Sequence, residues 1–432
     1  MKVSRYNWVV FHDKQMILYN GYTGALAVIL EKNYPYIEEL RKMEPMTSCD
    51  GYLKGVPGSL AKNLIDGGYV IADDRDELLE MQVLHNTQRY SSLISGITAV
   101  VTTYCNFACT YCYEGISCES KNVIESEVIR CIASLASESY GDEFYLALYG
   151  GEPLTALDEC IELLAKVAEA VVGRDAQFGA GIVTNGYLMT PDVARKLVSL
   201  GVREAQITLD GTQELHDSRR VLRNGQGTFN KILDNIRKIP SEMTVKVRMN
   251  IDQGLDQDLR EVTSQLHGLS NVSIHPAPTR YDHINLNSVA EVNQEYVDRC
   301  YPEYLINERL NARILGCVAT TLRGMVIMPD GSILKCWNEV GDDHSNYGNI
   351  KECRNPNLMI SMKWMQWDPY SLRSVCSSCK KLPQCCGGCP MEFVKGRPPR
   401  CRFKTDESFK RYIIQNYKHL TGQSEPCSLN TS

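Results

Sequence analysis

The sequence lacks the features of a membrane-bound or secreted protein. No stretch of its 432 residues approaches the roughly 18 uncharged apolar residues that a membrane helix needs. The first residues also lack a basic region followed by an apolar run and a small-residue cleavage site, the pattern of a secretory signal. These absences predict a cytoplasmic protein with no membrane partner.

An excess of positive charge is also missing. The chain has 46 Lys and Arg against 52 Asp and Glu, a formal net charge of −6, and its basic residues are scattered. Proteins that bind nucleic acid concentrate basic residues on one segment or face, so we expect no nucleic-acid partner. Internal repeats and low-complexity runs are absent as well, which excludes a repeat architecture.

Cysteine, in contrast, is abundant, with 18 residues. Thiols stay reduced in the cytoplasm, so many cysteines in a cytoplasmic chain indicate metal rather than disulfides. Two tight groups lie at 105–112 and 376–389, while six cysteines stand alone: Cys49, Cys118, Cys131, Cys160, Cys300 and Cys427. We interpret a lone cysteine as a small buried apolar side chain.

The length predicts two or three domains, because 432 residues exceed one ordinary core. Residues 1–90 show a hairpin pattern followed by three short helical patterns, which predicts a small winged-helix-like segment. Residues 91–278 alternate strand and helix patterns, which predicts an open (β/α)6 barrel of the α/β class. Residues 279–312 form a bridging region, and residues 313–432 are rich in Cys, Gly and Pro, as expected where metal organises the fold.

The predicted strands of the barrel are Ile97–Thr103, Phe144–Tyr149, Phe178–Thr184, Glu204–Leu209, Thr244–Ile251 and Val272–His275. Active sites of such sheets lie at the carboxyl ends of the strands. Notable residues follow four of the strands: Cys105, Gly150–Pro153, Thr184–Gly186 and Asp210–Gly211. We therefore expect these residues to meet at one edge of the sheet.

Cys105, Cys109 and Cys112 present three thiols within eight residues. Three soft thiolates so close together can ligate three irons of one [4Fe–4S] cluster and leave the fourth iron open. An open position suits a cluster that binds a cofactor or substrate. The alternative is a zinc site with a remote fourth ligand, because short cysteine spacings are common.

The spacing C-x3-C-x-aromatic-C, with Tyr111 as the aromatic residue, resembles the signature of the radical S-adenosylmethionine (SAM) superfamily. In that family the open iron binds the amino and carboxylate groups of SAM. An electron from the cluster then breaks a C–S bond and gives a 5′-deoxyadenosyl radical, which abstracts a substrate hydrogen. The resemblance implies SAM and a [4Fe–4S] cluster as cofactors, and a flavodoxin- or ferredoxin-type protein as electron donor.

Further residues resemble the family's SAM-contacting elements in order along the chain. Gly150, Gly151 and Glu152 resemble its GGEP element, in which glycines let the backbone approach the ligand and the glutamate meets the methionine ammonium. Thr184 and Asn185 resemble the residues that meet the ribose and carboxylate of SAM. The resemblance therefore implies that these five residues bind the cofactor.

Asp210 and Arg220 resemble a pattern of the peptide- and protein-modifying members, in which the arginine can pair with the SAM carboxylate. We assign His216, which lies between them, no catalytic role and interpret it as a surface or capping residue. Arg248 and Asn250 on the fifth strand either face the same cavity or support the strand.

The C-terminal cysteines follow the spacing C-x13-G-x4-C, a gap, C-x2-C-x5-C-x3-C, a gap and C, with Gly331 as the glycine. This spacing resembles the seven-cysteine SPASM module, which carries up to two auxiliary [4Fe–4S] clusters, whereas the alternative is an unrelated zinc ribbon. By position, the resemblance implies an outer cluster bound by Cys376, Cys379, Cys385 and Cys401. It implies an inner cluster bound by Cys317, Cys336 and Cys389.

Two departures separate this chain from the sulfatase maturases. Those enzymes have a further cysteine soon after the first, but residues 318–323 here read VATTLR, so the inner cluster has an open iron unless Cys353, Cys386 or a more distant residue fills it. They also place an aspartate base after the cysteine that matches Cys336, where this chain has Trp337. An open iron can instead hold a substrate thiolate beside a carbon radical, which favours thioether formation.

The resemblance therefore implies an enzyme that abstracts a hydrogen from a ribosomally synthesised precursor peptide and joins a cysteine sulfur to carbon, as sactipeptide and ranthipeptide maturases do. The alternatives are another oxidation or a carbon–carbon cross-link of a peptide or protein, including sulfatase-maturase-like activity. A non-catalytic iron–sulfur electron carrier is disfavoured, because it has no use for SAM-contacting elements. Residues 1–90 have the size of a leader-binding element, with a structural cap on the barrel as the alternative.

Overall fold

The computed structural model describes residues 1–90, 96–112, 114, 122–139, 141–251, 256–279, 317–341, 345–352, 362–398 and 400–422. The chain divides into two compact units. The first contains Met1–Tyr90, Gln294–Cys317 and Met365–Ser432, and the second contains Ser91–Asn293 and Val318–Trp364. The four regions that the sequence suggests stay a prediction, and the bridging region lies almost wholly outside the described residues. Within the described ranges, no helix has the length and apolar character needed to cross a membrane.

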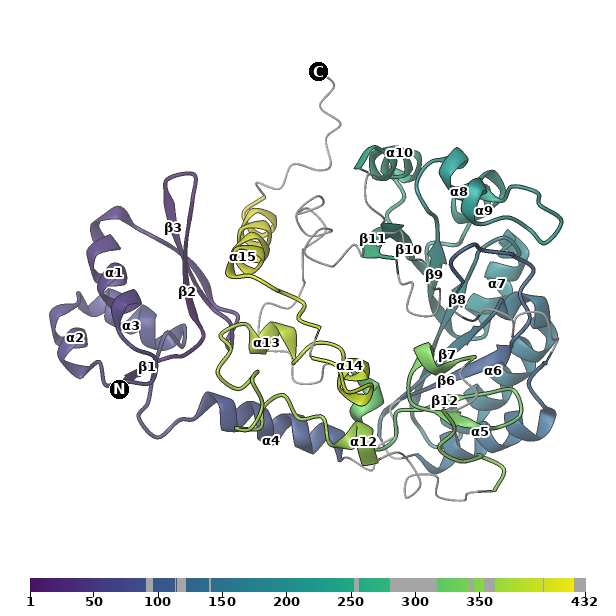
Figure 1. Ribbon diagram of the computed structural model, residues 1–432, viewed down its shortest axis with the longest axis horizontal. Helices are drawn as coiled ribbons and strands as arrows, with labels where there is room; N and C mark the ends of the chain where they lie inside the picture. Colours follow the sequence, from purple (N-terminus) through teal and green to yellow (C-terminus); the bar gives the residue numbers. More distant parts are fainter. Residues whose placement is uncertain are drawn as a thin grey trace. The chain divides into compact units, whose positions relative to one another are not determined.

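An eight-stranded sheet in the order β11-β10-β9-β8-β7-β6-β12-β13 forms the centre of the second unit (Figure 1). Its first six strands along the chain pair in parallel, each with the next. They are β6 (Gly96–Thr102), β7 (Glu143–Gly150), β8 (Gln177–Thr184), β9 (Val202–Thr208), β10 (Thr244–Ile251) and β11 (Val272–Pro278). The predicted α/β class and the partial barrel are confirmed.

The helices of this unit follow the predicted apolar spacing. They are α5 (Ser126–Glu138), α6 (Leu157–Val172), α7 (Pro191–Ser199), α9 (Phe229–Ile236) and α10 (Asp256–Leu266), with a short η3 (Pro153–Ala156) before α6. In α6, Cys160, Leu163 and Val167 are fully buried, because a spacing of three or four places them on one face. One further helix, α8 (Gln213–Arg219), was not predicted; it starts at Thr212, whose side chain accepts a hydrogen bond from the Leu215 amide.

A small hairpin from the C-terminal half of the chain extends the sheet beyond β6. Its strands are β12 (Val326–Ile327), which runs parallel to β6, and β13 (Ile333–Leu334). The turn between them requires Gly331, whose φ is +90° and whose added Cβ would lie 2.7 Å from Asn349 Oδ1. The turn explains the glycine within the cysteine spacing. Two single turns flank the hairpin, η5 (Val318–Thr320) and η6 (Trp337–Glu339).

The N-terminal part of the first unit begins with a three-stranded antiparallel sheet of β2 (Asn7–His12), β3 (Gln15–Asn20) and β4 (Leu26–Ile29). The predicted hairpin is β2-β3. The helices are η1 (Glu31–Asn33), α1 (Tyr34–Lys42), α2 (Asp50–Gly55), α3 (Gly58–Asp66) and α4 (Glu77–Arg89), while β1 (Lys2–Val3) pairs with β5 (Val70–Ile71). The three predicted helical patterns correspond to α1, α3 and α4.

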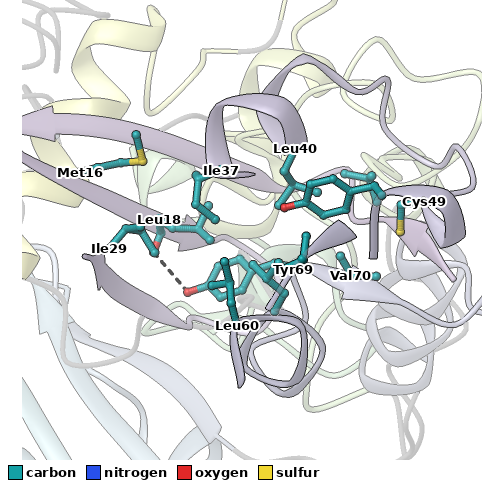
Figure 2. Close-up of a cluster of buried hydrophobic side chains, with 13 residues drawn as sticks. Met16, Leu18, Ile29, Ile37, Leu40, Cys49, Leu60, Tyr69 and Val70 are labelled. Atoms are coloured by element: carbon teal, nitrogen blue, oxygen red, sulfur yellow. Dashed lines mark hydrogen bonds between the residues drawn. The ribbon is translucent and has the colours of Figure 1, made fainter. Parts of the chain in front are cut away.

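Strand β3 is buried on both faces, so the sheet separates two hydrophobic cores. Met16 and Leu18 pack with side chains of α1 and α3, as Figure 2 shows, and the Tyr69 hydroxyl donates to the Leu18 carbonyl at 3.2 Å. Ile17 and Tyr19 point the other way and pack against α15 (Asp406–Leu420). The C-terminal segment also contains α12 (Met362–Met365), α13 (Leu382–Cys385) and α14 (Pro390–Val394). The N-terminal sheet therefore shares a core with the C-terminal helix.

Candidate functional site

A cavity of about 340 Å³ lies in the second unit at the carboxyl ends of the parallel strands. Most of the residues that the sequence singles out line it: Cys105, Cys109, Tyr111, Cys112, Gly150, Gly151, Thr184, Asn185, Arg220, Arg248, Asn250 and Trp337. Glu152 and Asp210 do not line it. The cavity thus combines three thiols, a guanidinium pair and an aromatic wall.

The cysteine loop that follows β6 is fixed by backbone hydrogen bonds to the end of α8 and the segment after it. The Ala108 amide donates to the Val221 carbonyl at 2.9 Å, and the Thr110 amide donates to the Arg219 carbonyl at 3.0 Å. The Phe107 amide points at Cys105 Sγ at 3.4 Å. Because these bonds hold the loop independently of any ligand, the thiols are presented to the cavity by the fold itself.

The three thiols lie beside an open cavity, as the ligands of a cluster with an open iron do. Burial raises the pKa of Cys105 to about 12 and also raises the pKa of Cys109, so both are neutral thiols until a metal displaces the proton. Among the described residues, no three His, Cys, Asp or Glu side chains converge closely enough to hold one metal ion. In a cubane each thiolate binds a different iron, so its ligands lie further apart. The donor set and the open cavity beside it fit a [4Fe–4S] cluster.

Gly150 and Gly151 let the loop after β7 pack directly on the backbone that leads to Cys105. A Cβ at Gly150, where φ is +133°, would lie 2.2 Å from the Thr102 carbonyl oxygen, and one at Gly151 would lie 2.6 Å from the Tyr104 oxygen. No larger residue fits either position without moving the chain. The two glycines therefore allow the backbone on this side of the cavity to lie directly against the chain that leads to Cys105.

Glu152 lies beneath the cavity wall rather than on it. Its fully buried carboxylate accepts hydrogen bonds from the Leu154 amide at 3.0 Å, the Thr184 hydroxyl at 2.7 Å and the Asn185 amide at 2.6 Å. The resemblance implies that this carboxylate meets the ammonium of SAM, which stays a prediction; in the structure, three groups of the chain itself donate to it. Its observed work is to fix the loop that carries Thr184 and Asn185.

Asn185 reaches from that loop to the cysteine loop. Its Nδ2 donates to Asn106 Oδ1 at 2.8 Å and lies 3.9 Å from Cys105 Sγ. Its Oδ1 accepts from the Tyr187 amide at 3.0 Å, which fixes the orientation of the side chain. The end of β8 is thereby tied to the first cysteine of the motif.

The Tyr111 hydroxyl is the centre of a buried polar network. It donates to the Asp210 carboxylate and accepts from the Arg220 guanidinium at 2.8 Å and from Asn250 Nδ2 at 3.1 Å. Asp210 also accepts from the Asn250 amide at 3.2 Å. Burial raises the pKa of Tyr111 above its ordinary range, so it stays protonated. The predicted Asp210 thus acts on the cavity through Tyr111 and Asn250.

Arg220 is the cation that this network holds at the cavity. Its own burial lowers the pKa, but Cys109, Tyr111 and Asp210 together raise it well above its ordinary value. Its Nε is buried and makes no hydrogen bond within the described part of the chain. A fixed cation with an unused donor fits an anionic group of a ligand, such as the carboxylate of SAM.

The aromatic wall is formed by Trp337 and by Tyr149, which sequence reasoning missed. The Trp337 indole donates to the Thr98 hydroxyl at 3.0 Å, and its ring lies 4.8 Å from the ring of Tyr149 at an interplanar angle of 30°. Both side chains line the cavity. The position of Tyr149 directly before Gly150, at the carboxyl end of β7, could have indicated it. Glu114, buried two residues after Cys112, also lines the cavity and was missed.

The predicted outer ligands gather within the first unit. Burial raises the pKa of Cys376, and the nearby thiols of Cys385, Cys401 and Cys379 raise it further. At Gly388 an added Cβ would lie 2.2 Å from the Arg400 carbonyl oxygen, so this glycine lets the segment of Cys385 approach that of Cys401. Four thiols are the number that one [4Fe–4S] cluster requires, and the assignment of these four as its ligands stays a prediction.

The predicted inner ligands stay a prediction. Cys317 and Cys389 belong to the first unit and Cys336 to the second. Of the alternatives for a fourth ligand, Cys353 lies outside the described residues, and Cys386 is buried at the end of α13.

The interpretation of His216 as a surface or capping residue is wrong, because its side chain is fully buried; it does not line the cavity. Its Nδ1 accepts from the Asp210 amide at 3.1 Å, which assigns the proton to Nε2. Nε2 lies 3.0 Å from the Thr228 hydroxyl, which in turn donates to the Arg220 carbonyl at 2.6 Å. Burial lowers the pKa of His216 to about 3, so the ring is neutral at physiological pH.

We predict that His216 makes the fold acid-sensitive. Unfolded His216 binds a proton near its ordinary pKa of 6.5, whereas the folded residue resists protonation until about pH 3, so stability is complete above pH 6.5 and falls below it. Between neutral pH and about pH 5, the loss is about 2 kcal/mol. Denaturant unfolding of the metal-free protein at both pH values measures it. His216→Gln should remove this loss, whereas His419→Gln, at an exposed site, should keep it; equal losses in all three proteins would contradict the prediction.

Known proteins are similar to this chain in sequence and in fold. Residues 99–264 match the model of the Radical SAM superfamily. A cysteine-type anaerobic sulfatase-maturating enzyme of Clostridium novyi (strain NT) is 24% identical over 369 residues, which cover 76% of this chain and 96% of the relative. The sporulation killing factor maturation protein SkfB of Bacillus subtilis (strain 168) is 26% identical over 268 residues, which cover 59% of each.

The crystal structure of Streptococcus suis SuiB is similar in fold, with a TM-score of 0.54 and 14% identity over 93% of this chain and 98% of SuiB. At this identity the likeness concerns the fold alone. The match of the barrel, together with the cavity that holds the three-cysteine motif, leads to one conclusion. Residues 99–264 form a radical SAM domain, and the chain resembles in sequence a sulfatase-maturating enzyme and the maturation protein SkfB.

Proposed function

We propose that the protein matures a ribosomally synthesised precursor peptide by forming a thioether between a cysteine sulfur and a carbon of that peptide. The observation that carries the proposal is the cavity, which joins the three-cysteine motif and Arg220 to an aromatic wall at Trp337. SkfB is by name a maturation protein, and SuiB has been solved bound to its precursor peptide SuiA. These relatives support a peptide as the substrate.

Different residues of the cavity would hold the cluster and SAM. Cys105, Cys109 and Cys112 would hold the cluster, and the wall formed by Gly150 and Gly151 leaves room for the cofactor to approach the backbone. Arg220 would pair with the SAM carboxylate. Bound there, the cluster and SAM supply a 5′-deoxyadenosyl radical that abstracts a hydrogen from the substrate.

Trp337 argues against the chemistry of the sulfatase maturases. Those enzymes have a carboxylate at this position, whereas here the indole N–H is bonded to Thr98 and the ring packs on Tyr149. An indole in this arrangement accepts no proton. We therefore favour capture of the carbon radical by sulfur over oxidation that depends on a base at this position. An open iron of the inner cluster, bound by Cys317, Cys336 and Cys389, would hold the substrate thiolate.

We also propose that residues 1–90 bind the leader of the precursor by strand addition. Strand β4 is an edge of the three-stranded sheet, and no described strand pairs with its outer side. Val28 on β4 and Leu30 just after it are 43% and 62% exposed. An open edge with exposed apolar side chains suits an extended peptide, which pairs through its backbone and fits side chains beside the strand.

Replacement of Arg220 tests its role in holding SAM. We expect Arg220→Gln to weaken SAM binding by about 10- to 100-fold, the loss typical of a buried charge-assisted hydrogen bond. Equilibrium binding of SAM to the reconstituted protein measures the effect, with iron content determined in parallel. Arg195→Gln, on the exposed face of α7, is the matched control and should bind normally. An unchanged affinity in Arg220→Gln with full iron content would contradict the role.

The reaction itself is tested with a candidate precursor peptide that contains cysteine. We expect reconstituted, reduced enzyme with SAM to remove two hydrogen atoms from the peptide, because a thioether replaces one S–H and one C–H bond. Mass spectrometry detects the change. Cys105→Ala should abolish it, and Cys131→Ala, at a lone cysteine outside the site, should not. A peptide with alanine in place of cysteine should stay unmodified, and its modification would refute the thioether.

The leader interaction is tested by hydrogen exchange. Added leader peptide should slow exchange of the amides of Leu26–Ile29, because strand addition gives outward-facing N–H groups a partner. A cysteine-containing peptide from the core of the same precursor is the control and should leave β4 unchanged. Leader binding without slower exchange in β4 would rule out strand addition at this edge.

A further inference from the structure

The loop that carries the predicted outer ligands is hydrogen-bonded to the N-terminal strands across more than 360 residues of sequence. Arg5 Nη1 donates to the carbonyl of Ser377, the residue after Cys376, at 3.2 Å. Gln384 Nε2, from the buried residue before Cys385, donates to the Gly21 carbonyl at 2.6 Å. Each bond joins a residue that flanks the strands of the N-terminal sheet to a residue adjacent to a predicted ligand.

Gly21 also permits a close backbone approach. A Cβ added there would lie 3.0 Å from Gln384 Oε1 and 3.7 Å from the ring of Pro383. The indole N–H of Trp8, on β2, points at the carbonyl of Lys380 at 3.5 Å. The N-terminal segment therefore contacts this loop at Ser377, Lys380 and Gln384.

Three of the predicted ligand thiols pack into cores that the N-terminal segment helps to build. Cys376 and Cys379 lie in a cluster with Tyr6, Leu78 and Met81. Cys385 packs against the cluster that contains the following aromatic side chains: Trp8, Tyr19, Phe409 and Tyr412. Three of the four predicted ligands thus belong to or pack against cores that include residues of the N-terminal segment, and the fourth, Cys401, is exposed.

The loop has little structure of its own to hold these positions. Its regular structure is the single turn of α13, Leu382–Cys385, and Cys386, Gly387 and Gly388 follow in left-handed conformations. A ligand loop of this kind takes its geometry from neighbouring elements, because cluster ligands must be held to within a fraction of an ångström. The neighbours here are β2, the β3–β4 turn and α4.

We propose that the N-terminal segment is part of the outer cluster's binding site. Arg5, Trp8 and Gly21 are positioning residues that hold the ligand loop, so the loading of this cluster and the order of the β2-β3 sheet depend on each other. The inference rests on the proposed ligands, Cys376, Cys379, Cys385 and Cys401. In this proposal the N-terminal segment has a role in cluster binding in addition to the proposed binding of the leader peptide.

Arg5 also adds a positive charge beside the loop. A cation near an iron–sulfur cluster stabilises its reduced form, which carries one more negative charge, and so raises the reduction potential. Loss of this charge lowers the potential, whereas a residue that only supports the fold leaves the potential of a loaded cluster unchanged. The reduction potential therefore separates a positioning role from a general structural one.

The first experiment replaces Arg5 in the full-length, reconstituted protein. We expect Arg5→Ala to contain less iron, by at most about one-third for one cluster of three, and its remaining outer cluster to have a lower reduction potential in a titration followed by electron paramagnetic resonance. Arg5→Lys should restore most of the potential. Arg41→Ala, which removes a surface arginine of α1, is the matched control and should match the wild type. Wild-type iron content and potential in Arg5→Ala would overturn the inference.

The second experiment removes Cys401 and asks whether loss of the outer cluster loosens the N-terminal strands. The exposed thiol can be removed without opening a cavity in either core, so Cys401→Ala should fold yet lose the outer cluster. We expect hydrogen exchange in Asn7–His12 and Gln15–Asn20 to speed up at least tenfold, while exchange in β7–β9 of the second unit stays unchanged. Unchanged exchange after loss of the iron overturns the inference, and full iron retention overturns the ligand assignment together with it. Neither readout uses a peptide, so a failure of the proposed thioether chemistry is distinguishable.

Discussion

The catalytic cavity depends on one buried interaction, the hydroxyl of Tyr111 between the Asp210 carboxylate and the Arg220 guanidinium. The tyrosine belongs to the cysteine motif, the aspartate follows β9 and the arginine follows α8, so this group joins three separate elements. A buried carboxylate and a buried guanidinium are each costly alone, and the hydroxyl lets them compensate one another. His216 then fixes the backbone behind both through its two ring nitrogens. The thiols, the cation and the strand ends are aligned because this network is complete.

A second constraint acts in the first unit, where the cysteines of the C-terminal segment cannot build a core by themselves. Their loop is short on regular structure and packs on side chains such as Tyr6 and Trp8 from the start of the chain. Burial of aromatic surface stabilises this arrangement, and hydrogen bonds such as that from Gln384 to Gly21 fix the position of the loop against the N-terminal segment. With the proposed ligand assignment, the N-terminal sheet supports the loop that carries the sulfur ligands, and its β4 edge is the proposed site for the leader peptide.

The sequence predicted what depends on local periodicity and spacing. The six parallel strands follow from apolar runs separated by helical patterns, and the position of Cys105 and Gly150 at one cavity follows from the rule that strands present their carboxyl ends together. It did not predict that Glu152 is occupied by Thr184 and Asn185, because a buried carboxylate and a ligand-binding one look alike in a motif. Nor did it predict the bond from Arg5 to Ser377, since no pattern relates residues so distant along the chain.

The central claim is that this cavity generates a radical that reacts with a peptide. Reduced, reconstituted enzyme is incubated with SAM and a precursor peptide whose carbon-bound hydrogens are replaced by deuterium, and 5′-deoxyadenosine is isolated. The account predicts that 5′-deoxyadenosine forms and carries one deuterium from the peptide, because the radical abstracts a hydrogen atom directly. If no 5′-deoxyadenosine forms, or if it forms without deuterium while the peptide is modified, the account is contradicted.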